Sequence, residues 1–136
     1  MKPNKTERTD KKDLTKAEEQ IMQILWKRGE AFVNEILDDL EEPKPAYNTV
    51  STFVRILVKK GFVGYNSFGK SHQYYPMITK DEYTKTFFKR FINNYFSNSY
   101  SELVSFFARE KDISIKDMED IHKIVQREIQ KQKEKP

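Results

Sequence analysis

The chain has 136 residues, of which 37% are hydrophobic and 34% charged, and its formal net charge at pH 7 is +4. This length fits one ordinary domain, or one small domain with an appendage. The absence of cysteine excludes disulfides, thiolate metal sites, iron–sulfur clusters and cysteine nucleophiles. No apolar run approaches the roughly 20 residues needed to cross a bilayer, and the first 13 residues lack the apolar segment of a signal peptide. We therefore expect a soluble, cytoplasmic protein with no membrane partner.

The charges are distributed unevenly along the chain. Residues 43–80 contain no Asp or Glu. The same segment carries six cations, Lys44, Arg55, Lys59, Lys60, Lys70 and Lys80. A segment that excludes one sign of charge has a positive field in any fold. It reflects either chance clustering or a face that binds nucleic acid, and we favour the second interpretation.

In chain order, residues 1–13 are polar and predict a disordered tail. A helix then begins at Thr15, because "TKAE" has the spacing of a capping box with Glu18 three residues on. Its apolar residues recur at helical spacing, and Gly29 ends it. A second helix with a similar apolar stripe follows, and Pro43 and Pro45 stop it.

A third helix is expected over residues 46–60, ending at Gly61. The next segment, "FVGYNSFGKSHQYYPM", predicts a β-hairpin, because aromatic and β-branched residues flank a polar turn that contains glycine. Three further capping patterns, "TKDE", "SYSE" and "SIKD", predict three short helices. We therefore divide the chain into a tail (1–13), a first domain (14–78), a helical domain (79–130) and a basic tail (131–136).

The third helix has an unusual polar face. Advancing 100° per residue places Asn48, Ser51, Thr52, Arg55 and Lys59 on one continuous stripe opposite the apolar residues. A solvated helix normally carries Glu, Lys and Gln there, since Thr, Ser and Asn are poorer helix formers. Short polar side chains let a helix approach a surface closely and reach base edges.

Helices that read the major groove present their N-terminal residues to the bases. Those residues are Asn48, Thr49, Ser51 and Thr52, whereas Arg55 and Lys59 are placed for phosphates or a guanine edge. The alternative is that the hydroxyls only cap the helix or bond back to its backbone. The hairpin favours the first interpretation, because Lys70, Ser71 and His72 at its tip add a second positive point. Three helices and a hairpin are the plan of a winged helix-turn-helix, with the wing against the DNA backbone.

The last three predicted helices carry broad apolar faces, which isolated short helices cannot leave uncovered. The simplest cover is the same region of a second copy around a twofold axis. The alternatives are that these helices fold back onto the first domain, or that their aromatic residues line a ligand pocket. The candidate dimerisation residues are Phe87, Phe88, Phe91, Ile92, Tyr95, Leu103, Phe106, Phe107, Met118, Ile121 and Val125.

The expected fold is therefore mainly α with one small antiparallel β-hairpin: an N-terminal winged helix-turn-helix, then a three-helix C-terminal dimerisation region. No phosphate-binding loop and no Ser/His/Asp set is present, and the two histidines, His72 and His122, fall in different modules. We predict no enzyme, no metal and no cofactor. A winged-helix module that docks a protein partner instead of specific DNA stays open as an alternative.

Three segments, "LTKAEEQIMQILWKRGEAFVNEILDDL", "NTVSTFVRILVKKGFV" and "GKSHQYYPMITKDEY", resemble the penicillinase/methicillin-resistance repressor family of the BlaI/MecI type. The resemblance runs from Leu14 to Tyr83, and more loosely to Ile129. It implies a winged-helix transcriptional repressor that binds palindromic operators as a homodimer. By position, it gives base-facing roles to Asn48, Thr49, Ser51 and Thr52, and backbone roles to Arg55, Lys59 and the wing at residues 70–72. Ile56 replaces a residue that is often Arg in the family.

The resemblance also bears on regulation. In β-lactam-responsive members, a sensor-protease signal ends in cleavage of an Asn-Phe bond in the dimerisation region. Phe106-Phe107 stands at the corresponding bond here. A regulatory protease is thus an implied further partner, with the cleaved bond left open. Copper-responsive relatives sense metal through C-terminal cysteines, which this chain lacks.

Overall fold

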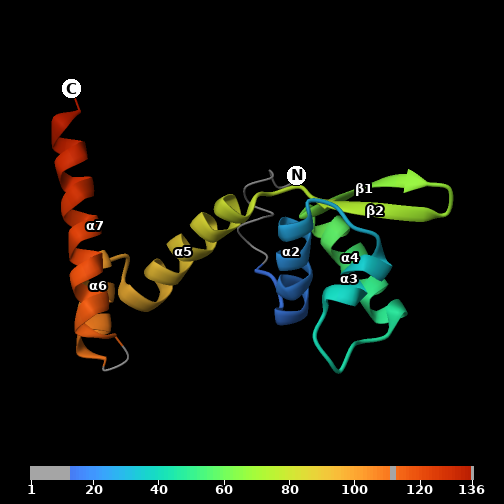
Figure 1. Ribbon diagram of the computed structural model, residues 1–136, viewed down its shortest axis with the longest axis horizontal. Coiled ribbons are helices and arrows are strands. Elements are labelled where there is room, and N and C mark those ends of the chain that lie inside the picture. The colour runs from blue at the N-terminus through green and yellow to red at the C-terminus, as the bar shows by residue number, and fades with distance from the viewer. Residues whose placement is uncertain (1–12, 111–112, 136) are drawn as a thin grey trace. The chain divides into compact units, whose positions relative to one another are not determined.

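The structure, a computed structural model, describes residues 13–110 and 113–135. The chain divides into two compact units, one that ends at Phe88 and one that begins at Lys89. We call them the winged unit and the C-terminal unit. The elements, labelled as in Figure 1, are α2 (Lys16–Arg28), α3 (Val33–Asp39), α4 (Tyr47–Lys60), β1 (Val63–Phe68), β2 (Ser71–Pro76), α5 (Lys80–Phe96), α6 (Tyr100–Arg109) and α7 (Ile115–Glu134). The expected fold class, mainly helical with one antiparallel hairpin, is confirmed.

The predicted capping patterns begin four of these helices. At α2, the Glu18 N–H donates to Thr15 Oγ1 at 3.2 Å, and the Thr15 N–H donates back to Glu18 Oε1 at 2.9 Å. Thr79 and Glu82 make the same reciprocal pair before α5. The hydroxyls of Ser99 and Ser114 accept from backbone N–H groups at the start of α6 and α7. Each cap satisfies a donor that the first turn of a helix leaves unpaired.

The core of the winged unit is formed by the apolar stripes of α2, α3 and α4. Met22, Leu25, Ile36, Val54 and Leu57 have no exposed surface. They meet because each helix turns one apolar face inward at 3.6-residue spacing. The hairpin adds Phe62, Val63 and Tyr74 to the same cluster. Close packing of this kind fixes where α4 lies in the unit.

The sheet is the antiparallel hairpin β1–β2, in which Phe68 pairs with Ser71 across the turn. A single bridge extends it: the N–H groups of Ala31 and Tyr74 each donate to the other's carbonyl at 2.8 Å. The sequence analysis did not anticipate this bridge, because one residue carries no period-2 pattern. The bridge ties the loop before α3 to the base of the wing.

The division between the two units falls inside α5, ten residues beyond the boundary expected at residue 78. The cause is the packing of its first turn. Tyr83 is buried in the winged-unit core, with ring centroids 5.9 Å from both Trp26 and Phe62. Trp26 also donates from Nε1 to the Ile78 carbonyl at 2.8 Å. The segment that enters α5 is thereby fixed to α2.

The chain's ends also compare with expectation. Of the predicted disordered tail, all but Asp13 lies outside the described residues. The predicted basic tail begins as helix instead, since α7 continues to Glu134. Two contacts at i,i+4 spacing accompany this extension, Gln132 Nε2 to Glu128 Oε1 at 3.0 Å and Gln130 Nε2 to Glu134 Oε1 at 3.1 Å. Such pairs stabilise a helix end.

Candidate nucleic-acid interface

Helix α4 turns one face into the core and leaves the other exposed. Val50, Val54 and Leu57 are buried against α2 and α3. The predicted polar stripe lies on the opposite side, where Asn48, Thr49, Thr52, Arg55 and Lys59 are exposed and Ser51 is half-buried. The structure therefore brings the predicted base-facing residues together on one accessible surface.

Two of these side chains contact the backbone of their own helix. The Thr52 hydroxyl donates to the Asn48 carbonyl at 2.8 Å, and Arg55 Nε approaches the Ser51 carbonyl at 3.4 Å. The Thr52 hydroxyl proton is thus engaged, although its oxygen lone pairs are not. Thr52 offers a partner an acceptor and a methyl group instead of a donor. For Thr52, the structure therefore shows the back-bonding that the alternative interpretation expects of the hydroxyls.

The N-terminus of α4 differs from those of α2, α6 and α7, which hydroxyl side chains cap. Its N-cap is Ala46, which makes no side-chain cap, and its first turn contains no acidic residue. The first N–H groups of a helix point outward, and the helix dipole makes that end favourable for anions. This end of α4 is open to an anionic partner.

The wing places a positive charge beside this helix. Its turn is Gly69–Lys70, where Gly69 takes a positive φ of 63°, a conformation that glycine adopts without steric cost. Lys70 and Ser71 are exposed. His72 is half-buried because its ring stacks on Tyr65, with centroids 4.3 Å apart and planes 10° apart. Of the three predicted wing residues, His72 is therefore the one most constrained.

A cleft of about 680 Å³ separates α4 from the wing. Its walls come from the N-terminal part of α3, from α4 and from the hairpin. They are formed by Phe32, Val33, Asn34, Glu35, Tyr47, Ser51, Arg55, Phe68, Lys70, Ser71, His72 and Tyr74. The sequence analysis missed Tyr47 and Asn34. The available signal was that Tyr47 stands four residues before Ser51 and eight before Arg55, on the same face of α4.

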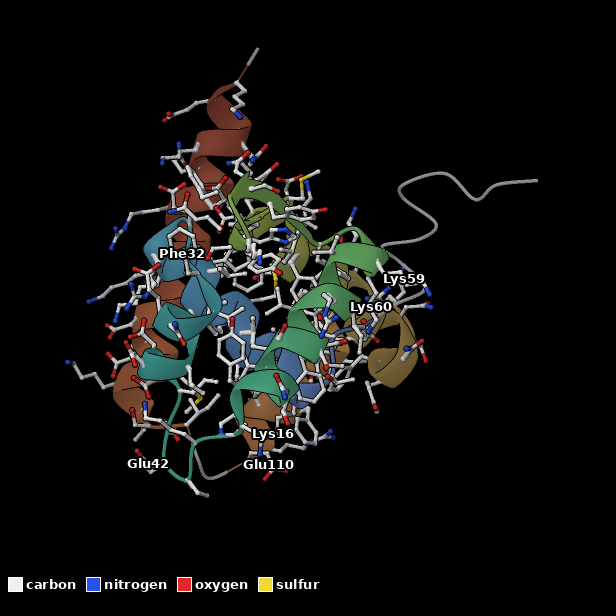
Figure 2. All side chains as sticks on the ribbon, turned by 90° about the vertical axis from the view of Figure 1, so that its right-hand side faces the viewer. Lys16, Phe32, Glu42, Lys59, Lys60 and Glu110 are labelled. Atoms are coloured by element: carbon white, nitrogen blue, oxygen red, sulfur yellow. The ribbon has the colours of Figure 1, made fainter. Side chains whose placement is uncertain are left out.

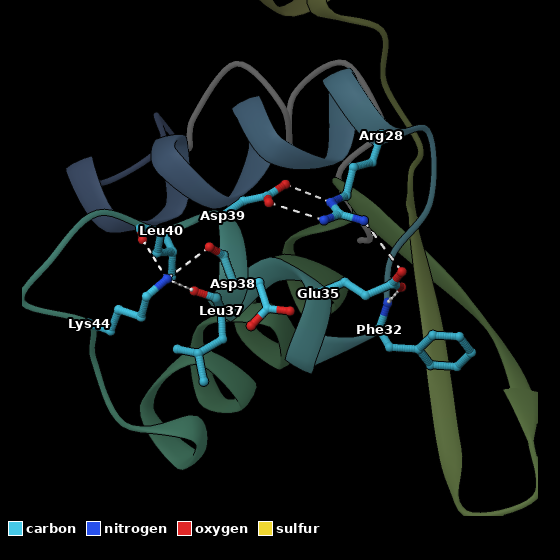
Figure 3. Close-up of polar contacts among 8 residues, drawn as sticks. All are labelled: Arg28, Phe32, Glu35, Leu37, Asp38, Asp39, Leu40 and Lys44. Carbon is cyan, nitrogen blue, oxygen red and sulfur yellow. Dashed lines mark hydrogen bonds and ion pairs between the residues drawn. The ribbon is translucent and has the colours of Figure 1, made fainter.

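Two of the six cations in the acid-free segment are engaged inside the winged unit. Lys44 Nζ donates to the carbonyls of Leu37, Asp38 and Leu40 at 2.8–3.0 Å, which caps the C-terminus of α3 (Figure 3). Lys60 Nζ lies 2.7 Å from Glu18 Oε1, and Glu18 is 2% exposed. Carbonyls are neutral and leave the charge of Lys44 in place, whereas the ion pair offsets that of Lys60. The exposed cations of the segment are therefore Lys44, Arg55, Lys59, Lys70 and Lys80, and the last four make no such contact with the end of a helix.

Adjacent lysines at the end of α4 thus have different environments. Figure 2 shows Lys59 and Lys60 next to each other at the C-terminal end of this helix. Lys59 is exposed, whereas Lys60 is half-buried in its ion pair. Burial alone would raise the pKa of Glu18, but hydrogen bonds from Lys60 and from the Thr15 N–H outweigh it and lower that pKa.

A second ion-pair group fixes α3 to α2. The Arg28 guanidinium donates to both carboxylate oxygens of Asp39, at 2.6 and 3.0 Å, and contacts Glu35 at 3.4 Å (Figure 3). The hydrogen bond to Asp39 raises the pKa of Arg28 and lowers that of Asp39. Glu35 also accepts from the Phe32 N–H at 2.9 Å. These contacts position the helix that precedes α4.

The predicted dimerisation residues lie on α5, α6 and α7. Ile92 and Leu103 are buried within their own chain, and Phe91 is half-buried. The other eight are exposed, namely Phe87, Phe88, Tyr95, Phe106, Phe107, Met118, Ile121 and Val125. On α7 no residue is buried at all. An apolar surface of this extent is unusual on a monomeric protein.

Nowhere in residues 13–110 and 113–135 do three or more His, Cys, Asp or Glu side chains gather to hold a metal ion. In the same residues, no helix combines the length and apolar character that crossing a membrane requires.

Helices α2, α3 and α4, followed by an antiparallel hairpin beside the exposed face of α4, define a winged helix-turn-helix protein. The sequence matches the model of the penicillinase repressor family over residues 14–127. The chain belongs to this family, which confirms the resemblance noted above.

The chain is similar to two named groups of relatives. It is 27% identical to the methicillin resistance regulatory protein MecI of Staphylococcus aureus (strain N315) over 114 residues, which is 83% of this chain and 93% of MecI. It is 22% identical to the penicillinase repressor of Bacillus licheniformis over 122 residues, covering 89% and 95% of the two chains.

Solved structures also align with the chain. The DNA-binding domain of the repressor BlaI matches with 25% identity and a TM-score of 0.46, over 52% of this chain and 87% of that domain. The repressor CopR matches with 31% identity and a TM-score of 0.42, over 49% of this chain and 99% of that structure.

Proposed function

We propose that this protein is a sequence-specific DNA-binding transcriptional repressor that acts as a homodimer on a palindromic operator. The observation that carries the proposal is the exposed, acid-free face of α4 with its open N-terminus, next to the wing. Membership of the penicillinase repressor family supports it. Repression then requires only that the bound protein occupy a promoter that RNA polymerase must use.

The residues of α4 and the wing divide into two roles. Asn48, Thr49, Ser51 and Thr52 meet base edges in the major groove, where short side chains allow close approach. The phosphates on either side are contacted by Arg55 and Lys59 from α4 and by Lys70, Ser71 and His72 from the wing. Phosphate contacts supply affinity and base contacts select the sequence.

In this proposal, the C-terminal unit forms the interface with the second copy of the chain. Its apolar surface on α6 and α7 is exposed in one chain, and a twofold interface would cover the same patch on both protomers. Two winged units joined in this way place two α4 helices about one helical turn of DNA apart, or a multiple of that distance. The operator is then palindromic because the protein is symmetric.

A regulatory protease is a further partner in this proposal. Its target region, around Phe106 and Phe107, lies within helix α6, and both side chains are exposed. Cleavage there would divide the surface that joins the protomers. Loss of the dimer would then release the operator without any change in the winged unit.

The test begins with selection of a preferred duplex from a randomised library, followed by fluorescence anisotropy on that duplex and on a scrambled one. Asn48→Ala should weaken the selected duplex by about 1–3 kcal/mol and leave the scrambled duplex unchanged. Lys70→Ala should weaken both duplexes alike. Equal losses on both duplexes for Asn48→Ala would contradict the division of roles. Failure of the unaltered protein to bind any duplex at low salt would favour the protein-docking alternative.

A further inference from the structure

We propose that the cleft between α4 and the wing seats one phosphate of the DNA backbone, and that the Tyr47 hydroxyl donates to it and sets the depth of α4 in the groove. This inference rests on the proposed function. Tyr47 is outside the set of residues to which the sequence and the family resemblance assign a role. It is the first residue of α4 and its side chain is 48% exposed.

The lining of the cleft has the chemistry of a phosphate site. Arg55 and Lys70 bring positive charge from opposite walls, and Tyr47 and Ser71 bring hydroxyl groups. Phosphate oxygens are acceptors only, so cations and hydroxyl donors are the groups that bind them. A base edge would instead call for paired donors and acceptors of fixed geometry, such as amides, and Asn34 is the one amide among the lining residues.

One carboxylate, Glu35, also lines the cleft, and both of its oxygens have hydrogen-bond donors within the protein. Glu35 Oε1 accepts from the Phe32 N–H at 2.9 Å, and its Oε2 lies 3.4 Å from Arg28 Nη1. Each oxygen therefore faces a donor of the winged unit (Figure 3). The two cations in the lining, Arg55 and Lys70, outnumber this one carboxylate, so the lining keeps a net positive charge.

Tyr47 is a lining residue of the cleft whose hydroxyl donor is available to a partner. Within residues 13–110 and 113–135, neither Tyr47 nor Lys70 hydrogen-bonds to any group of the protein through its side chain. The Tyr47 phenol and the Arg55 guanidinium lie close enough to Tyr74 for both to act on its pKa, which burial raises. Tyr74 is itself buried in the wall of the cleft. Tyr47 lines the same cleft from the first turn of α4.

Because Tyr47 is at the start of α4, a contact between its hydroxyl and a phosphate would affect how α4 sits in the major groove. The helix begins at this residue, and Asn48 and Thr49 follow directly on the face proposed to meet the bases. A phosphate held by Tyr47 on one side of α4 limits how deeply the helix enters the groove. Tyr47 is thus a positioning residue, and its contribution is the same for every DNA sequence because the backbone is the same.

The experiment compares Tyr47→Phe with the unaltered full-length protein on the selected and scrambled duplexes. The variant keeps the ring and removes only the donor. Loss of a hydrogen bond to a charged group should lower affinity about tenfold on both duplexes. Because tyrosine carries no charge, the slope of log affinity against log salt should not change, whereas Lys70→Gln should reduce it by about one per protomer.

A matched control and a second measurement identify the partner atom. Tyr65→Phe changes an exposed tyrosine of the wing that does not line the cleft, and it should bind like the unaltered protein. The second measurement uses selected duplexes in which one phosphate at a time is replaced by a neutral methylphosphonate. At one position per half-site, the replacement should lower the affinity of the unaltered protein and have little effect on the affinity of Tyr47→Phe.

Three outcomes overturn the inference. Tyr47→Phe binding like the unaltered protein would show that the hydroxyl does not contact DNA. A loss confined to the selected duplex would make Tyr47 a base-reading residue. If every methylphosphonate weakens Tyr47→Phe as much as it weakens the unaltered protein, then the Tyr47 hydroxyl does not bind a phosphate. In each case the unaltered protein still prefers the selected duplex, so the proposed function survives; only failure of that preference removes both.

Discussion

The two units of this chain satisfy their apolar surface in opposite ways. In the winged unit, three helices and a hairpin close a core around Met22, Leu25, Ile36 and Leu57. In the C-terminal unit, among the described residues, only Ile92 and Leu103 are buried. Apolar burial is the main favourable term in folding. The comparison teaches that the first unit buries its apolar residues in a core of its own, whereas the second leaves most of its apolar residues exposed.

The same contrast appears in the placement of charge. The winged unit buries Glu18 against Lys60 and turns its remaining cations outward. Helix α7 has charged residues on one side and exposed Met118, Ile121 and Val125 on the other. One unit therefore presents a polar surface with exposed cations, and the other presents an apolar surface, which the proposed function assigns to DNA and to a second copy respectively. The predictions below test this comparison in order of expected size.

The largest effect is expected at α7. Ile121 is 47% exposed in one chain, so Ile121→Glu should leave the protomer folded and place a charge in each half of the proposed interface. Burying an unpaired charge costs several kcal/mol, so we expect the dimer to weaken at least about 100-fold. Sedimentation equilibrium measures this directly, and operator affinity should fall with it.

The control for this variant is Lys123→Glu, on the opposite side of α7 by helical spacing. It should leave the dimer intact. If Ile121→Glu stays dimeric at the same concentrations, the apolar face of α7 is covered by something other than a second copy. The winged unit should melt at the same temperature in either variant, because its core is separate.

The second prediction concerns the ion pair between α2 and α4. Glu18→Gln should destabilise the winged unit by about 3 kcal/mol, because it leaves Lys60 without its buried counter-charge. Chemical denaturation followed by the fluorescence of Trp26 reports this loss. Glu19→Gln, next to it but exposed, is the matched control and should change stability little.

The pH dependence of stability follows from the same pair. The pKa of Glu18 is lower in the folded protein than its ordinary value. Its contribution is therefore present above the unfolded-state pKa and is lost as pH falls through the folded-state pKa. The unaltered protein should lose stability on acidification more steeply than Glu18→Gln. Parallel stability curves between pH 7 and pH 3 would show that the pair contributes nothing.

Much of the winged unit could be predicted from the sequence because its signals are local. Thr15 with Glu18, and Thr79 with Glu82, are spaced to cap a helix, and a cap involves only residues three apart. The helical spacing of polar and apolar residues from Asn48 to Lys59 likewise predicted which face of α4 is exposed.

What could not be predicted depends on contacts far apart in the chain. Lys60 pairs with Glu18 across 42 residues, and Trp26 donates to Ile78 across 52. No motif links the members of either pair, so Lys60 could not be distinguished from Lys59 in the sequence. Tyr47 was missed for the same reason: the cleft that it lines exists only when the wing folds beside α4.

The third prediction tests the role of Thr52. Its hydroxyl proton is engaged with the Asn48 carbonyl, so a base would meet its methyl group or its oxygen lone pairs. If the methyl group makes the contact, Thr52→Val should bind the selected duplex within about threefold of the unaltered protein. Thr52→Ala should then lose about 1–2 kcal/mol on that duplex, as measured by anisotropy. Equal losses for both variants would show that the oxygen atom is what the DNA contacts.

The smallest effect separates two neighbouring lysines of α4. Lys59 is exposed and Lys60 is paired with Glu18, so the same change at each should act on different properties. Lys59→Gln should reduce the slope of log affinity against log salt by about 0.9 per protomer, through the loss of one phosphate contact, with no change in melting temperature. Lys60→Gln should lower the melting temperature and leave the slope unchanged. Salt titrations and thermal melts measure both properties for both variants. A lower melting temperature for Lys59→Gln, or a reduced salt slope for Lys60→Gln, would contradict the assignment of Lys59 to DNA and Lys60 to the fold.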